Sequence, residues 1–218
     1  ALDLAMRVGG EILAADSMQV YRGMDIGTAK PTPAERAAVP HHLIDLVYPD
    51  EPFSAARYAE EFARAAAEVA ARGRLPMVVG GTGLYIRAAT RPFLFPDVGA
   101  RPEIRAALTR LAAEIGPQGL HRELAAVDPE AAARIHPHDL RRIIRALEVY
   151  RATGRPISFW QRSFKGDSSP YETIYVCLTR ERGELYRRIE ARAEAMIAAG
   201  LVEEVRSLLA AGYGRDLP

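Results

Sequence analysis

Acidic, hydroxyl and amide side chains gather in the segment ADSMQVYRGMDIGTAKP, residues 15–31. Its first carboxylate, Asp16, follows an apolar run of strand length at Glu11 to Ala15. Ligands of open parallel sheets bind beyond the carboxyl ends of the strands, so we expect Asp16 to lie at a reaction crevice. A carboxylate there could accept a proton from a substrate or hold a magnesium ion. Asp16 followed by Gln19 could instead cap a short helix, and the residue types leave both interpretations open.

A second segment that could bind a ligand is VGGTGLY, residues 79–85. Gly80 and Gly81 would let the backbone approach a ligand, and Thr82 offers a hydroxyl at the start of a helix, where anions are favoured. A tight strand-to-helix turn would need glycine equally. The sequence contains no G-x-x-x-x-G-K-[ST] motif, so this segment is not a Walker A loop.

Arginine supplies 27 of the 29 basic residues, and these concentrate in one region. Residues 134–165 carry eight basic side chains and two acidic ones, Asp139 and Glu148. Within HPHDLRRIIRALEVY, residues 136–150, apolar residues recur at helical spacing. Three arginines fall on the opposite side of this helix: Arg141, Arg142 and Arg145. Such a face suits phosphate contacts, although a solvated helix face gives the same pattern.

A single arginine interrupts the last long apolar helix pattern. Arg192 falls between Leu185 and Met196 within the stripe that would face a core. A guanidinium directed there needs a partner, which in a crevice could be a phosphate. A buried salt bridge, or a side chain that extends its charged end to water, is the structural alternative.

The elements that must position these groups follow a βαβ pattern. Apolar runs at His42 to Val47 and Leu75 to Val79 have strand length, and a helix begins between them after the plausible N-cap Ser54. A run at Thr173 to Leu178 returns to strand character, and we expect Cys177 within it to lie in the core. This alternation predicts a parallel sheet.

Residues 103–153 read as several helices without a strand, between a proline-rich segment at 91–102 and a loop at 163–170. The predicted fold class is therefore α/β, with a parallel-sheet core and an inserted all-helical domain. We expect the first part of the core at 1–95, the helical insertion at 96–168 and the second part of the core at 169–218.

The composition sets the broad class. The chain has 218 residues, 49% of them hydrophobic and 26% charged, and a net charge of +1, so its bulk charge does not mark it as a nucleic-acid binder. A single cysteine excludes an intramolecular disulfide and favours a reducing compartment. No apolar run approaches the roughly 20 residues that span a bilayer. We therefore expect no membrane association and a cytoplasmic location.

Six segments, in this order, closely resemble the tRNA dimethylallyltransferase (tRNA isopentenyltransferase) family. They are ADSMQVYRGMDIGTAKP, PHHLIDLV, FSAARYAEE, GGTGLY, DPEAAARIHPHDLRRIIRALEVY and LYRRIEARAEAMIAAGLVEEV. The resemblance implies a P-loop-type, nucleotide- and ATP-binding class of core, with an inserted helical domain that grips the anticodon stem-loop of tRNA. It implies transfer of a dimethylallyl group from dimethylallyl diphosphate to the exocyclic N6 amine of the adenosine next to the anticodon, with magnesium and release of diphosphate. We also expect a monomer.

The resemblance assigns roles by position. Asp16 matches the general base, and Arg192 matches the arginine that holds the diphosphate. The positions that match tRNA contacts are Asp16, Ser17, Met18, Gln19, Thr82, Arg105, Arg141, Arg142, Ile143, Ile144 and Arg145. No metal ligands are assigned. The family's phosphate-binding loop would precede Ala1 and a further tRNA-contacting segment would follow Pro218, so we expect the activity to need residues outside this sequence.

Three other functions fit parts of the pattern. In a P-loop small-molecule kinase, Asp16 would ligate magnesium and the arginines would clamp ATP. An isopentenyltransferase that acts on free adenine nucleotide would have little need for the exposed arginine face. A non-catalytic RNA-binding module would bind anticodon stem-loops without turnover. The basic helical insertion favours RNA over a nucleotide.

Overall fold

The computed structural model describes residues 1–91, 101–162, 169–214 and 217. The chain forms two compact units, one of Ala1–Thr90 with Tyr171–Pro218 and the other of Arg91–Pro170. The first unit contains a parallel sheet with helices, and the elements described in the second are all helical. The predicted fold class, an α/β core with an inserted helical domain, is confirmed. The two predicted loops fall mostly at 92–100 and 163–168, outside the described residues.

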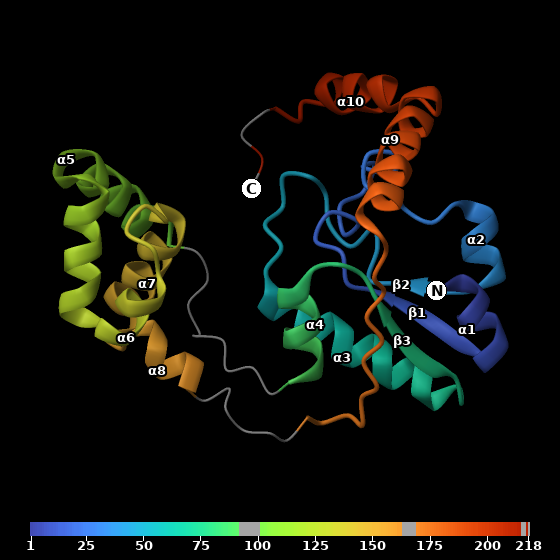
Figure 1. Ribbon diagram of the computed structural model, residues 1–218, viewed down its shortest axis with the longest axis horizontal. Helices are drawn as coiled ribbons and strands as arrows, with labels where there is room; N and C mark the ends of the chain where they lie inside the picture. Colours follow the sequence, from blue (N-terminus) through green and yellow to red (C-terminus); the bar gives the residue numbers. More distant parts are fainter. Residues whose placement is uncertain (92–100, 163–168, 215–216, 218) are drawn as a thin grey trace. The chain divides into compact units, whose positions relative to one another are not determined.

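The first unit is a three-stranded parallel sheet in the order β2-β1-β3 (Figure 1). Its elements are α1 (Leu2–Val8), β1 (Gly10–Ala14), α2 (Pro33–Ala38), β2 (His41–His42), α3 (Ala55–Ala71), β3 (Leu75–Val79), α4 (Gly83–Thr90), α9 (Arg182–Ala198) and α10 (Leu201–Ala210). Every residue of β1 is buried, because both faces of the sheet are covered. Leu13 packs with α3 and α4, whereas its neighbour Ile12 packs with α1 on the opposite face.

The helix α3 begins where the sequence predicts, after the N-cap Ser54. The Ser54 hydroxyl accepts a hydrogen bond from the Arg57 N–H at 3.2 Å, and Tyr58, Phe62 and Val69 are buried at helical spacing. Gly73 follows the helix in the left-handed conformation with φ of 68°. The Tyr58 hydroxyl donates to the Ala14 carbonyl at 3.1 Å, which ties α3 to the strand that precedes Asp16.

The strand predicted at His42 to Val47 is shorter than expected. Only His41 and His42 pair with β1, and Val47 forms an isolated bridge with Tyr21. Leu43 and Asp45 adopt positive φ angles of 65° and 56°, a conformation that ends an extended strand.

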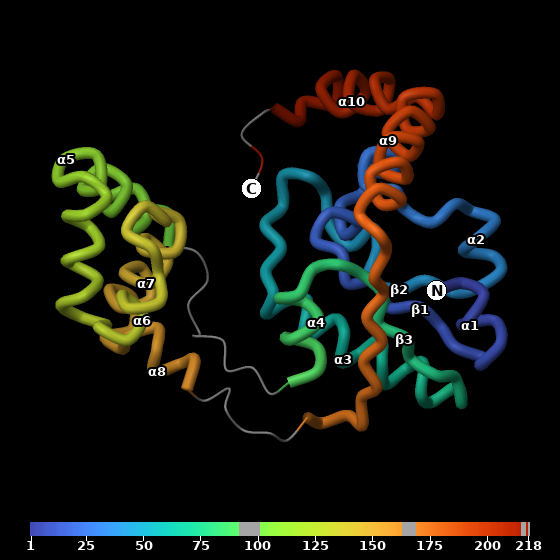
Figure 2. Tube along the Cα trace, viewed as in Figure 1, coloured from blue at the N-terminus to red at the C-terminus, as the bar shows by residue number. Residues whose placement is uncertain are grey.

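The strand predicted at Thr173 to Leu178 is wrong in the described chain. This segment is extended but pairs with no described strand, and Figure 2 traces it past the sheet to the start of α9. Its side chains are accordingly open to solvent: Ile174 is 89% exposed and Leu178 86% exposed. Cys177 is also exposed, so its predicted place in the core is wrong. A strand requires a hydrogen-bonded neighbour, which an apolar pattern alone does not supply.

The second unit packs four described helices around its own apolar core. They are α5 (Pro102–Val127), α6 (Pro129–Arg134), α7 (Leu140–Thr153) and α8 (Ile157–Arg162). Gly116, with φ of 74°, breaks α5 into two segments just before Pro117. Leu108, Leu120 and Ile143 are fully buried in the core between them. In the described part of the chain, no helix is both long and apolar enough to cross a membrane.

Candidate active site

A cavity of about 350 Å³ lies in the first unit, beside the segment that follows β1. One wall comes from that segment and the other from α9 and α10. The lining residues are Asp16, Met18, Met24, Gly27, Thr28, Arg192, Leu201, Glu204, Val205 and Leu208. The structure therefore brings together Asp16 and Arg192, the two residues for which the sequence predicted catalytic roles.

The Asp16 carboxylate divides its two oxygens between structure and solvent. Its Oδ1 accepts hydrogen bonds from the N–H groups of Met18, at 2.8 Å, and Gln19, at 3.3 Å. Residues 17–20 form a turn rather than a helix, so this is a turn cap with the hydrogen bonds that the capping interpretation requires. No described residue donates a hydrogen bond to Oδ2, and the side chain is only half-buried. Capping and chemistry are therefore compatible at this residue.

The turn after β3 supports the turn that carries Asp16. The Thr82 hydroxyl accepts a hydrogen bond from the Ser17 N–H at 3.0 Å, and the Thr82 N–H donates to the Ala15 carbonyl at 3.0 Å. A Cβ on Gly80 would overlap the Ala15 backbone, whereas one on Gly81 would meet nothing within 4 Å. The tight-turn interpretation therefore explains Gly80, while Gly81 remains open to a ligand.

Tyr85, on α4, is a buried aromatic side chain whose pKa is affected by the Asp16 carboxylate. Burial, together with the nearby Tyr21 and the Asp16 carboxylate, raises the pKa of Tyr85 to about 12. Its phenol stays neutral at physiological pH and cannot act as the base.

The loop that forms one cavity wall is anchored by the buried side chain of Lys30, a residue that the sequence analysis missed. Its side chain is 1% exposed and forms ion pairs with Asp25 at 2.7 Å and Asp45 at 2.6 Å. Burial alone would raise the pKa of Asp45, but Lys30 and Arg36 outweigh it and hold that pKa below its usual value. Gln19 adds a second attachment, because its amide donates to the carbonyls of residues 28 and 29. The available signal was a lysine in a chain whose other basic residues are nearly all arginine.

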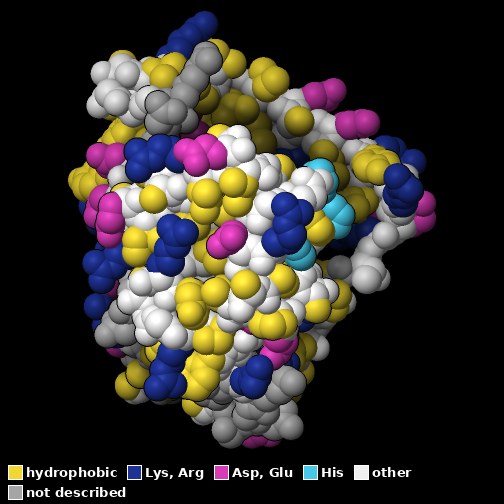
Figure 3. Space-filling model, turned by 90° about the vertical axis from the view of Figure 1, so that its left-hand side faces the viewer, with side chains coloured by type: hydrophobic (Ala, Val, Ile, Leu, Met, Phe, Trp, Pro, Cys, Tyr) yellow, Lys and Arg dark blue, Asp and Glu magenta, His cyan; other side chains and the backbone are white. Residues whose placement is uncertain are grey.

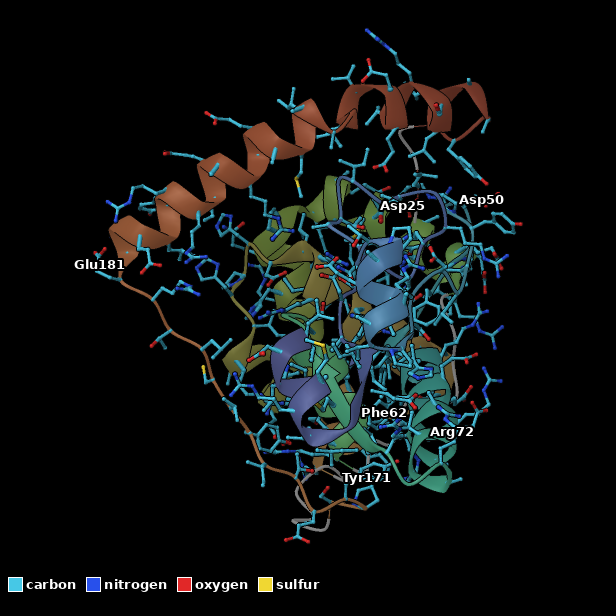
Figure 4. All side chains as sticks on the ribbon, turned by 90° about the vertical axis from the view of Figure 1, so that its right-hand side faces the viewer. Asp25, Asp50, Phe62, Arg72, Tyr171 and Glu181 are labelled. Carbon is cyan, nitrogen blue, oxygen red and sulfur yellow. The ribbon has the colours of Figure 1, made fainter. Side chains whose placement is uncertain are left out.

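The same loop is also bound by Glu204 of α10, another residue that the sequence analysis missed. Its carboxylate accepts hydrogen bonds from three successive N–H groups, those of Asp25 at 2.7 Å, Ile26 at 2.7 Å and Gly27 at 3.0 Å. Figure 4 shows Asp25 on the side of the core beneath α10. These contacts join residues about 180 positions apart, so no local pattern marks Glu204.

The place predicted for Arg192 needs correction. The helix α9 buries none of its residues, and Arg192 is exposed rather than directed into a core. It has no ion pair or hydrogen bond with any described residue, so the buried salt bridge is also wrong. Its guanidinium therefore remains available to a ligand in the cavity that it lines.

In the second unit, a buried carboxylate organises two of the predicted tRNA-contacting arginines. Glu148 is 0% exposed and accepts hydrogen bonds from Arg105 at 3.0 Å, Arg145 at 2.9 Å and the Arg101 N–H at 2.8 Å. Burial by itself raises the pKa of Glu148, but these three donors outweigh it and hold the pKa below its usual value. Glu148 therefore stays ionised at neutral pH.

The other residues of the predicted tRNA-contacting stretch differ in exposure. Arg141 and Arg142 are exposed, and Arg142 forms an ion pair with Asp139 at 3.4 Å. Ile143 is 0% exposed in the helical core and Ile144 is half-buried. Ile143 thus serves packing, and the arginines are the side chains of this stretch that can reach an RNA. Figure 3 shows one face of the molecule, on which basic side chains lie among apolar and acidic ones.

The described residues do not include a preformed metal centre. No three His, Cys, Asp or Glu side chains among them are grouped to hold an ion. At the cavity, Asp16 has an unoccupied oxygen, while Glu204 is occupied by backbone N–H groups. This arrangement fits a magnesium ion held chiefly by substrate phosphates and one carboxylate, as is usual for that ion.

The chain is similar to known proteins along its whole length. The family model described as "IPP transferase" matches residues 19–218. The protein named "tRNA dimethylallyltransferase" from Roseiflexus sp. (strain RS-1) is 59% identical over 218 residues, which are 100% of this chain and 70% of that relative. The protein of the same name from Geobacillus thermodenitrificans is 55% identical over 215 residues, which are 98% of this chain and 66% of that relative.

Two solved structures extend the comparison. The full-length tRNA isopentenylpyrophosphate transferase from Bacillus halodurans aligns with a TM-score of 0.63 at 44% identity, over 99% of this chain and 66% of that one. A eukaryotic dimethylallyltransferase described as acting on tRNA aligns with a TM-score of 0.81 at 27% identity, over 100% of this chain and 54% of that one. The chain therefore spans about half to two thirds of these structures. On the match of residues 19–218 and these identities, the chain belongs to the IPP transferase family.

Proposed function

We propose that this chain is the greater part of a tRNA dimethylallyltransferase, a prenyltransferase that transfers a dimethylallyl group from dimethylallyl diphosphate to tRNA. The observation that carries the proposal is that Asp16 and Arg192 line the same cavity in a member of this family. One residue offers a free carboxylate oxygen and the other an unpaired guanidinium. These are the two groups that an alkylation with a diphosphate leaving group needs.

The reaction would use Asp16 as a general base. The target is the exocyclic N6 amine of the adenosine next to the anticodon, and this amine is a poor nucleophile because its lone pair is delocalised into the ring. Removal of its proton as the new bond forms lowers the barrier. The Oδ1 hydrogen bonds from Met18 and Gln19 fix the carboxylate, so Oδ2 can receive that proton. The adenine would enter the cavity after leaving its stack.

Arg192 would stabilise the leaving group. As the allylic C–O bond breaks, negative charge develops on the diphosphate oxygens, and a guanidinium fork can bind two of them. Magnesium, which we propose as the cofactor, would be held by the diphosphate oxygens and would neutralise part of the same charge, which leaves Oδ2 of Asp16 free to receive the proton.

The helical unit would bind the anticodon stem-loop through Arg105, Arg141, Arg142 and Arg145. We propose that Ser17, Met18, Gln19 and Thr82 contact RNA at the mouth of the cavity. We propose that the protein acts as a monomer, since both proposed catalytic side chains come from one chain. We also propose a cytoplasmic location. The relatives described above are named as transferases that act on tRNA, and not as kinases or enzymes of free nucleotides.

The test is incubation of the full-length protein with tRNA and dimethylallyl diphosphate, followed by digestion and nucleoside mass analysis. We expect one adenosine per tRNA to gain a dimethylallyl group, and none when the diphosphate is omitted. Free AMP in place of tRNA is the matched control for the nucleotide-modifying alternative. Binding of tRNA without any modified nucleoside would refute the transferase and favour the RNA-binding module.

A further inference from the structure

We propose that Glu204 is a positioning residue that sets how far apart the Asp16 wall and the Arg192 wall of the cavity stand. The inference rests on the proposed function of these two residues. It concerns the contact between α10 and the loop of residues 24–28, which no part of the reaction itself requires.

The contact is strong for one made by a half-buried side chain. Three successive backbone N–H groups, of Asp25, Ile26 and Gly27, converge on one carboxylate at 2.7 to 3.0 Å. Hydrogen bonds to a charged acceptor are stronger than neutral ones, and successive N–H groups form an anion-binding concavity. A Cβ on Gly27 would lie 3.1 Å from Leu201, so α10 also packs closely on this loop.

The position of Arg192 depends on this contact because α9 has no buried residue of its own. The helix α9 continues into α10 through Gly200, whose φ is 99°. Arg192 lies eight residues before that glycine, about 12 Å along the helix. A displacement of α10 from the loop would therefore move Arg192 with it.

The other side of the contact leads to Asp16. Gln19 donates from its side chain to the carbonyls of Thr28 and Ala29, and from its backbone to the Asp16 carboxylate. Glu204 thus joins the helix pair that carries Arg192 to the loop of residues 24–28, and the hydrogen bonds of Gln19 join that loop to the turn that carries Asp16.

The chain supplies a matched control for this role. Glu203 is the adjacent residue, is exposed, and pairs with Arg206 of its own helix at 3.3 Å. The loop itself keeps its attachment to Lys30 when Glu204 is removed. Glu204→Ala should therefore still fold, although loss of its three hydrogen bonds should lower its melting temperature below that of Glu203→Ala.

The experiment compares Glu204→Ala and Glu203→Ala in the full-length enzyme. We expect kcat/KM for dimethylallyl diphosphate to fall roughly 10 to 100 fold in Glu204→Ala, as a misplacement of about 1 Å does elsewhere, and to stay within about twofold in Glu203→Ala. Glu204→Gln keeps one acceptor oxygen and should recover part of the loss. In a double-mutant cycle with Arg192→Ala, the two losses should not add, because both act through the same guanidinium. Additive losses would overturn the positioning role.

Amide hydrogen exchange supplies a readout that does not depend on activity. The N–H groups of Asp25, Ile26 and Gly27 should exchange faster in Glu204→Ala than in Glu203→Ala or the parent. If the parent is active but Glu204→Ala leaves the exchange of these three N–H groups unchanged, the positioning role is overturned and the proposed function stands. A parent that modifies no tRNA would overturn the proposed function, and the positioning role with it.

Discussion

Replacement of Asp16 by asparagine separates the two roles that its carboxylate can have. The Oδ1 atom accepts from the N–H groups of Met18 and Gln19, and an asparagine carbonyl oxygen can accept the same two hydrogen bonds. The Oδ2 atom, to which no described residue donates a hydrogen bond, becomes an amide nitrogen. The substitution therefore preserves the turn and removes the base.

The two roles predict effects of very different size. Asparagine caps about as well as aspartate, so the free energy of unfolding should change by less than about 0.5 kcal/mol. Loss of a general base lowers turnover by roughly 100 to 10,000 fold. This corresponds to about 2.7 to 5.4 kcal/mol of transition-state stabilisation, at about 1.36 kcal/mol for each tenfold change.

The assay measures single-turnover dimethylallylation of tRNA by the full-length protein, together with tRNA affinity and thermal denaturation. We expect Asp16→Asn to lose turnover while its melting temperature and tRNA affinity stay near those of the parent. Affinity should hold because removal of a negative charge does not weaken phosphate contacts. Near-parental turnover in Asp16→Asn would refute the general base and leave the turn cap as its full role.

Three further substitutions test the remaining groups. Arg192→Lys keeps the charge but loses the fork, so KM for dimethylallyl diphosphate should rise or kcat should fall at unchanged tRNA affinity; unchanged kinetics would contradict its diphosphate role. Arg141→Ala should weaken tRNA binding and make the salt dependence shallower by roughly 0.7 to 0.9, and a parental slope would show that this side chain makes no phosphate contact. The pKa of Glu148 lies below its usual value, so its ionised form stabilises the helical unit above about pH 4.3, and this stability is lost as pH falls through the lowered pKa. Glu148→Gln should reduce that acid-induced loss in denaturation scans, and superimposable pH curves would argue against it.

The features predicted correctly from the sequence are those that depend on neighbours along the chain. The cap at Ser54 and the helix that follows it depend on residues a few positions apart, so local pattern was sufficient. The strand at Leu75–Val79 was predicted correctly for the same reason. The buried environment predicted for Arg192 is wrong, because a helical wheel assumes that an apolar stripe is buried.

The features that were missed depend on contacts between distant segments. Leu43 and Asp45 bend the chain after β2 with positive φ angles, a conformation that aspartate tolerates but that a leucine in an apolar run does not signal. The Asp45 carboxylate binds Lys30 and Arg36 there, and these bonds are invisible to strand propensity. In the sequence, nothing near Glu204 distinguishes it from the adjacent Glu203, because its contacts lie in a distant segment.

The net charge of +1 gives no indication of the exposed arginines around Glu148, for a related physical reason. Several acidic residues are internal: Glu11 is 5% exposed beside Arg72, and Glu148 is fully buried beside Arg105 and Arg145. At Glu148 one carboxylate faces two guanidinium groups, so the cluster keeps a net positive charge. The arginine side chains are also 51% and 37% exposed, whereas the carboxylate is 1% exposed. An approaching phosphate therefore meets the guanidinium groups first, and the buried carboxylate fixes their direction. A formal charge count treats these groups as cancelling, although their depths differ.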